Sequence, residues 1–183
     1  LSNTAPPETP RFVQSNSKLL FLTDRVPGTG TNTVKLVAHG EATVPTTLAT
    51  GALGQLSEQC SPKPSCIAFV VSPDGNKVAF VADYVSQAVG GRLKVASLTN
   101  GQVVDTGTAA GDGAILFTPD SQKVLLRTNR QCGGNCWDLV LDNVDGSGRT
   151  ILYSGISGGG FRLSTDGSKA VFSASSLVKV ITI

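Results

Sequence analysis

The chain has 183 residues, a formal net charge of +2 and only 15% charged residues. So small a net charge, without any run of Lys or Arg, argues against nucleic acid as a partner. No apolar run approaches the roughly 20 residues that cross a bilayer, so we expect a soluble folded part without a membrane span. Abundant glycine, 21 residues, together with Thr-, Ser- and Val-rich segments favours an all-β protein of short strands and tight turns.

The first ten residues differ in composition from the rest of the chain. They contain Pro6, Pro7 and Pro10, and proline has no backbone N–H to donate to a strand ladder. We therefore interpret residues 1–10 as an extended arm and residues 11–183 as the folded domain.

One turn-and-strand unit recurs through that domain. In its clearest copy, Ser-Pro-Asp-Gly at 72–75 is followed by an apolar strand that opens at Lys77. Pro presets φ, Asp bonds its own backbone and Gly accepts positive φ, which predicts a tight hairpin turn. Further copies place Lys123 and Lys169 at successive steps of 46 residues, and a degenerate copy surrounds Asn16. This period is typical of one four-stranded propeller blade.

The strands of the blades follow from hydrophobic alternation between turn signals. We predict an all-β propeller of about four blades, near residues 11–50, 66–108, 114–154 and 161–183. The predicted strands are 11–13, 18–23, 33–38 and 43–48; 66–72, 77–83, 91–98 and 102–108; 114–118, 123–127, 137–142 and 150–154; and a start at Phe161, then 169–173 and 177–183. The last blade lacks its outer strand, so the chain is a fragment of a larger propeller, closes alone, or completes a ring or filament with another copy.

The repeated Ser-Pro-Asp-Gly-x-Lys-Val-Ala-Phe-Val pattern resembles the TolB-like, WD40-like (PD40) repeats found in periplasmic TolB and in the propellers of oligopeptidases. The resemblance covers residues 11–183 and departs from the pattern at Asn16 and at Ser121, which replaces Gly. It implies a propeller fold and no particular function. Because Asp74, Asp120 and Asp166 occur once in each copy, we interpret them as turn residues.

Four cysteines lie in two short loops. Cys60 and Cys66 bracket five residues, and Cys132 and Cys136 bracket three. We predict local disulfides, although four cysteines allow three connectivities and only geometry can choose among them. A four-thiolate zinc site is the alternative, disfavoured because neither spacing is the Cys-x-x-Cys of zinc knuckles. Disulfides indicate a secreted or periplasmic protein.

Blade topology places both cysteine loops on one rim, together with insertions at 24–32 and 83–92. Variable loops on a rigid frame often carry binding sites. The candidate rim residues are Arg25, Tyr84, Arg92, Arg130 and Trp137. The alternative is that these are ordinary solvated residues and that Trp137 packs between blades.

Catalytic and metal motifs are weak. The segment 155–159 fits G-x-S-x-G around Ser157, but it forms an inter-blade link where a nucleophile elbow needs a strand-to-helix turn, and the single histidine, His39, precedes Ser157. The acidic, glycine-rich segment 142–148 lacks the ligand pattern of a calcium loop and predicts a hairpin turn. We expect no catalytic residue, metal or cofactor.

These observations favour a non-enzymatic, extracytoplasmic propeller module that binds a protein or cell-surface partner through the disulfide-bearing rim. One alternative is a self-assembling subunit whose open fourth blade is completed by a neighbour's residues 1–10, giving a homo-oligomer. Another is the non-catalytic propeller of a larger hydrolase.

Overall fold

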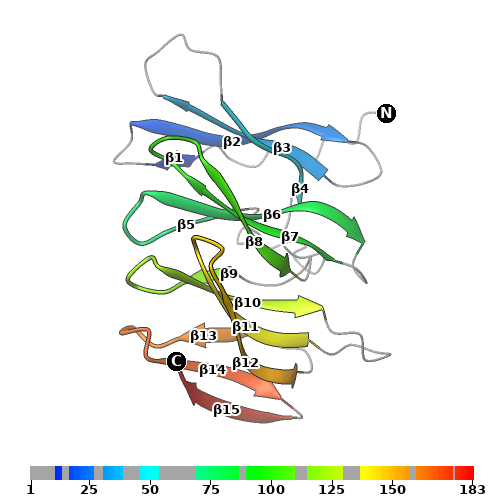
Figure 1. Ribbon diagram of the computed structural model, residues 1–183, viewed down its shortest axis with the longest axis vertical. Coiled ribbons are helices and arrows are strands. Elements are labelled where there is room, and N and C mark those ends of the chain that lie inside the picture. Colours follow the sequence, from blue (N-terminus) through cyan, green and yellow to red (C-terminus); the bar gives the residue numbers. More distant parts are fainter. Residues whose placement is uncertain are drawn as a thin grey trace.

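The computed structural model describes residues 11–13, 17–26, 31–38, 46–53, 69–86, 90–109, 115–129, 137–156, 160–174 and 176–183. These residues form four antiparallel sheets, each made of strands that are consecutive in the chain. Figure 1 shows the sheets stacked in a row, from the N-terminal sheet at the top to the C-terminal sheet at the bottom. We call the sheets blades one to four. Arg130 and the four cysteines lie outside the described residues, and so does the arm 1–10.

Within the described residues, three blades have four strands and the fourth has three. Blade one contains β1 (Arg11–Val13), β2 (Lys18–Val26), β3 (Thr31–Ala38) and β4 (Thr46–Leu53). Blade two contains β5 (Phe69–Val71), β6 (Lys77–Ser86), β7 (Gly90–Ser97) and β8 (Val103–Ala109). Blade three contains β9 (Ile115–Phe117), β10 (Lys123–Asn129), β11 (Trp137–Asn143) and β12 (Arg149–Ile156). Blade four contains β13 (Phe161–Leu163), β14 (Lys169–Ala174) and β15 (Leu177–Thr182).

The predicted strand order is confirmed, but several boundaries were wrong. The outer strand of blade one is β4 at Thr46–Leu53, where the sequence predicted 43–48. The insertions predicted at 24–32 and 83–92 are mostly strand, because β2 and β6 run on to Val26 and Ser86. In β6 the register shifts between Ala82 and Ser86, and Asp83 has φ 51°. A bulge of this kind accommodates extra residues without ending the ladder of hydrogen bonds. For this reason, the loss of hydrophobic alternation in the sequence did not mark the end of the strand.

The turn unit repeats atom for atom. In the β5–β6 turn, Ser72 Oγ donates to Asp74 Oδ1 at 2.5 Å, and the Asn76 N–H donates to the same oxygen at 3.0 Å. The Lys77 N–H donates to Ser72 Oγ at 2.9 Å, which closes the turn. Equivalent bonds form in the β9–β10 and β13–β14 turns. The structural role predicted for the aspartates therefore holds, and the preceding hydroxyl residue shares it.

The core lies between the blades. In β6, Val78, Phe80 and Ala82 face blade one, whereas Ala79 and Val81 face blade three, and all five are fully buried. A third apolar cluster fills the space between blades three and four. Because an inner strand is covered on both faces, it requires an unbroken apolar run, as the sequence shows at 78–82.

The two ends of the blades form two rims. We call one the turn rim: it carries the β5–β6, β9–β10 and β13–β14 turns on the left of Figure 1, together with the β7–β8 and β11–β12 turns. The other, the cysteine rim, is the opposite end, where β2, β6 and β10 end and β3, β7 and β11 begin; in the sequence, Cys132 and Cys136 fall between β10 and β11. No helix in the described part of the chain has the length and apolar character to cross a membrane.

Candidate functional site

The five predicted rim residues are distributed over three blades. Arg25 lies in β2 and Tyr84 in β6, so both belong to strands and not to loops as predicted. The structure describes the side chains of two members of the set, Arg92 in β7 and Trp137 in β11. Each of these two contacts a residue of its own blade, and they form separate local sites.

Arg92 takes part in a charged network on blade two. Its Nε donates to both carboxylate oxygens of Asp105, at 3.1 and 2.9 Å. Lys94 Nζ lies 3.0 Å from Asp105 Oδ2 and 3.0 Å from Asp83 Oδ2. The hydrogen bond to Asp105 is the main cause that raises the pKa of Arg92. Burial raises the pKa of Asp105, but the bonds from Arg92 and Lys94 outweigh it and lower that pKa. The network holds Arg92 in place while its side chain stays 45% exposed.

Trp137 begins β11 and pairs with Asn129 at the end of β10. The Arg127 guanidinium carbon lies 4.6 Å from the centre of its ring, within the range of a cation–π contact. Trp137 packs against the apolar cluster between blades three and four, as the alternative prediction stated, yet its side chain is only half-buried. The result is an aromatic surface held by an arginine at the edge of the cysteine rim. The sequence contained no signal for this pair, because Arg127 and Trp137 meet only through strand register.

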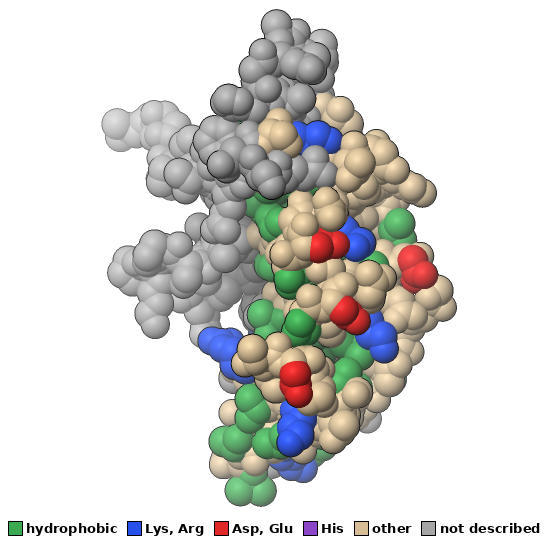
Figure 2. All heavy atoms as spheres, turned by 90° about the vertical axis from the view of Figure 1, so that its left-hand side faces the viewer, with side chains coloured by type: hydrophobic (Ala, Val, Ile, Leu, Met, Phe, Trp, Pro, Cys, Tyr) green, Lys and Arg blue, Asp and Glu red, His purple; other side chains and the backbone are tan. Residues whose placement is uncertain are grey.

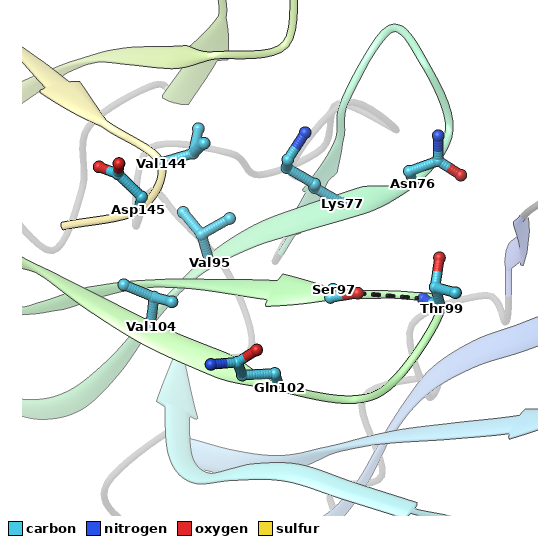
Figure 3. Close-up of a pocket in the computed structure, with 9 residues that line it drawn as sticks. All are labelled: Asn76, Lys77, Val95, Ser97, Thr99, Gln102, Val104, Val144 and Asp145. Carbon is cyan, nitrogen blue, oxygen red and sulfur yellow. Dashed lines mark hydrogen bonds between the residues drawn. The ribbon is translucent and has the colours of Figure 1, made fainter. Parts of the chain in front are cut away.

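The turn rim carries a pocket that the sequence analysis did not predict. It has a volume of about 380 Å³ and is lined by Asn76, Lys77, Val95, Ser97, Thr99, Gln102, Val104, Val144 and Asp145. Figure 3 shows that the last two come from the β11–β12 turn of blade three and the others from blade two. The Thr99 N–H donates to Ser97 Oγ at 3.3 Å, which shapes one wall. Because two blades supply the lining, no local motif could have revealed the pocket.

The charges on the turn rim are mixed. Lys77 Nζ lies 3.4 Å from Asp74 Oδ2, and Lys18 Nζ of blade one donates to the carbonyls of Leu98 and Thr99 of blade two. Figure 2 shows acidic and basic side chains alternating along this face. Neither sign of charge dominates the described side chains of this face (Figure 2).

Two segments of the sequence have features of metal-binding or catalytic motifs, the acidic turn at 142–148 and the G-x-S-x-G segment at 155–159. The segment 142–148 forms the β11–β12 hairpin turn, as predicted, in which the Ser147 N–H donates to Asp145 Oδ1 at 2.9 Å. In the described part of the chain, no three His, Cys, Asp or Glu side chains gather as a metal site would require. Ser157 and His39 lie outside the described residues.

The stacked four-stranded sheets, each repeating one turn unit, define a β-propeller architecture. The fold predicted from the turn repeats is thereby confirmed, with an incomplete set of blades. No family model matches the chain, and no curated protein matches its sequence.

Solved structures share this fold. TolB from Acinetobacter baumannii has a TM-score of 0.54 and 18% identity, over 96% of this chain and 40% of that chain. The β-propeller domain of the Trilobed protease from Pyrococcus furiosus has a TM-score of 0.59 and 14% identity, over 89% and 46%. The acylaminoacyl peptidase from Pyrococcus horikoshii has a TM-score of 0.57 and 13% identity, over 90% and 27%.

The predicted resemblance to TolB-like propellers is therefore confirmed at the level of the fold. This chain spans less than half the length of each of these proteins. Identities below a fifth say nothing about ligands, since one propeller architecture serves many functions.

Proposed function

We propose that this chain is a non-enzymatic, extracytoplasmic propeller module that binds a protein or cell-surface partner through the cysteine rim. The observation that carries the proposal is the half-buried ring of Trp137, stacked by Arg127. Trp, Tyr and Arg dominate the binding energy of protein interfaces, especially where packing has already fixed their rotamers. Because the two side chains already hold each other in place, they lose less conformational entropy when a partner binds.

Arg92 adds a second anchor to this surface in the proposal. Its guanidinium is exposed and oriented by Asp105, so it can donate hydrogen bonds to a partner's carboxylate without first being ordered. Together Trp137 and Arg92 suit a partner surface that offers an apolar groove and an acidic group.

The first test uses binding of the purified chain to extracytoplasmic protein extract of its source cells, measured by photo-cross-linking and by surface immobilisation. Trp137→Ala is expected to weaken capture of a specific partner at least tenfold, and Arg92→Glu several-fold. The control is Ser154→Ala on β12, a replacement of a small exposed residue. Equal capture by all four proteins, with unchanged thermal unfolding, would overturn the proposal for this rim.

The extracytoplasmic assignment depends on the disulfides predicted at Cys60–Cys66 and Cys132–Cys136. Maleimide labelling of the denatured, unreduced protein is expected to modify none of the four thiols, and labelling after reduction is expected to modify all of them. Four labelled thiols before reduction would remove the basis for this location.

A second candidate is the propeller of a larger hydrolase, favoured by the fold shared with the acylaminoacyl peptidase from Pyrococcus horikoshii. In both candidates the chain itself is not an enzyme. Assays of this chain with ester and peptide substrates are therefore expected to show no turnover. Turnover that disappears in Ser157→Ala would contradict this proposal and restore the G-x-S-x-G motif as a catalytic element.

A further inference from the structure

We call the face of each blade that is turned toward the C-terminal end of the row its outward face, and the opposite face its inward face. In blades two, three and four, equivalent strand positions form the outward face. Strand pairing sets Leu141 opposite Leu125 in blade three, and Val180 opposite Val171 in blade four. In blade two the same position of β7 is Val95, opposite Ala79. Two residues earlier in each third strand lie Leu93, Leu139 and Val178. Val178 and Val180 therefore occupy positions that are interior in the preceding blades.

Exposure at these positions separates blade four from the others. Leu93 and Val95 are 0% and 3% exposed, and Leu139 and Leu141 are 0% and 5% exposed, because the next blade covers them. Val178 and Val180 are 75% and 61% exposed. Neighbouring apolar side chains exposed to this degree are a common feature of interaction surfaces.

The covering surface is apolar at every step along the row. The outward side chains of blade three, among them Leu125, Leu139 and Leu141, pack on inward residues of blade four that include Phe161, Ala170 and Phe172. In blade two, the corresponding inward residues of β6 are Val78 and Phe80, both fully buried against blade one. Each outward face in the row thus meets an apolar inward face that includes at least one Phe.

Among the described residues, blade one holds the inward face that no other blade covers. Leu19 and Phe21 follow Lys18 as Val78 and Phe80 follow Lys77, yet they are only half-buried. Blades one and four stand at opposite ends of the row (Figure 1), so these two faces do not cover each other within one chain.

We propose that the outward face of blade four, formed by Val171, Val178 and Val180, packs on the inward face of blade one, formed by Leu19 and Phe21, of a second copy of this chain. The interface continues the stacking rule seen within the chain, so it is heterologous, and two such interfaces close a ring of two copies. Two copies bring eight described sheets together, the upper end of the usual range of about four to eight blades.

One charged residue shares the outward face without opposing this packing. Arg162 in β13 stands where blade three has Leu116, and its Nη1 donates to the Phe161 carbonyl at 2.9 Å. The guanidinium is thus turned back onto its own strand, and the apolar area lies on β14 and β15.

The first test is sedimentation equilibrium of the chain over a hundredfold range of concentration. Wild type is expected to reach twice the monomer mass, and Val178→Glu combined with Val180→Glu is expected to remain monomeric. Ile151→Glu on β12 is the matched control, an apolar residue that is 59% exposed but lies outside this face, and it is expected to dimerise as wild type does. A wild-type monomer at every concentration, or a dimer in the double variant, overturns the proposal.

The second test identifies the opposing surface, and it holds even if the double variant fails to fold. A photoreactive benzoylphenylalanine replaces Val178, the more exposed of the two valines, and mass spectrometry locates intermolecular cross-links. Cross-links to residues 11–26 of a second copy are expected. Links to 169–183 would mean symmetric pairing of two fourth blades, and links to 1–10 would mean strand addition by the arm. Either result, or no intermolecular link, overturns the proposal.

Discussion

The backbone N–H of Asp74 donates a hydrogen bond to Ser121 Oγ at 3.1 Å, which joins the β5–β6 turn of blade two to the β9–β10 turn of blade three. Ser121 stands where the other two turns have Gly75 and Gly167, and like them it adopts positive φ, at 59°. Its departure from the repeated pattern therefore has a structural reason, because the side chain reaches the neighbouring blade. The side chain is fully buried at that contact.

Replacing Ser121 separates the hydrogen bond from the backbone strain. Ser121→Ala is expected to lower the free energy of unfolding by about 1 kcal/mol or more, since the Asp74 N–H loses its acceptor. Ser121→Gly loses the same bond but removes a left-handed conformation that costs about 1–2 kcal/mol, so it is expected to remain near wild type. Urea unfolding measures both variants, and equal destabilisation would argue against this division.

Gly167 and Gly75 form a matched pair at equivalent turn positions, with φ +73° and +71°. A Cβ at Gly167 would lie 2.6 Å from Pro119 Cδ of blade three, whereas a Cβ at Gly75 meets nothing within 4 Å. Gly75→Ala is expected to cost about 1 kcal/mol of backbone strain. Gly167→Ala is expected to cost about 1–3 kcal/mol more, because the proline ring cannot move aside. Thermal unfolding that ranks the two variants equally would refute the close packing of these turns.

Asp142 and Arg149 form a bidentate ion pair in blade three, with Nε–Oδ1 and Nη2–Oδ2 distances of 2.6 Å. Asp142 is fully buried and also accepts from Thr106 Oγ1 of blade two at 3.3 Å. Arg149→Met leaves a buried carboxylate without its cation and is expected to destabilise the protein by about 3–5 kcal/mol.

Two variants control this prediction. Arg92→Met breaks a pair that remains partly exposed and is expected to cost at most about 1 kcal/mol. Asp142→Asn combined with Arg149→Met removes the buried charge and is expected to recover part of the loss. Denaturant unfolding would contradict the buried-pair argument if Arg92→Met and Arg149→Met had equal effects.

The turn aspartates predict a loss of stability in acid. Burial raises the pKa of Asp74, but the bonds from Ser72 and Asn76 and the charge of Lys77 outweigh it and lower the pKa to about 2. The hydroxyl of Ser164, followed by the bonds from Ser168, lowers the pKa of Asp166 to about 2. Because these pKa values lie below the value of about 3.9 in an unfolded chain, the carboxylates stabilise the fold fully above about pH 4 and progressively less toward pH 2.

Urea unfolding at several pH values between 7 and 2 measures this effect. The free energy of unfolding is expected to fall most steeply below pH 4. The variant carrying Asp74→Asn, Asp120→Asn and Asp166→Asn is expected to be less stable at pH 7 and to depend less on pH in that interval. The same acid dependence in the triple variant would assign the effect to other carboxylates.

Local chemistry allowed much of this architecture to be predicted from the amino acids alone. A hydroxyl residue, a proline or threonine, an aspartate and a residue able to adopt positive φ specify the same turn wherever they recur, since the bonds that close it lie within six residues. The uninterrupted apolar run after each turn likewise predicted a strand that is covered on both faces. Blade order and the hairpin at 142–148 followed from these local signals.

The contacts between blades could be found only from the tertiary structure. The link from Asp74 to Ser121 and the pocket shared by Lys77 and Asp145 depend on how one twisted sheet rotates against the next. The residues that meet between blades in these two cases are about 45 to 70 positions apart, and their side-chain types carry no signal of the meeting. The contact of Arg127 with Trp137 lies within blade three and depends on strand register. Likewise, β15 has the sequence of a covered strand, and only the stacking of the blades revealed that Val178 and Val180 are exposed.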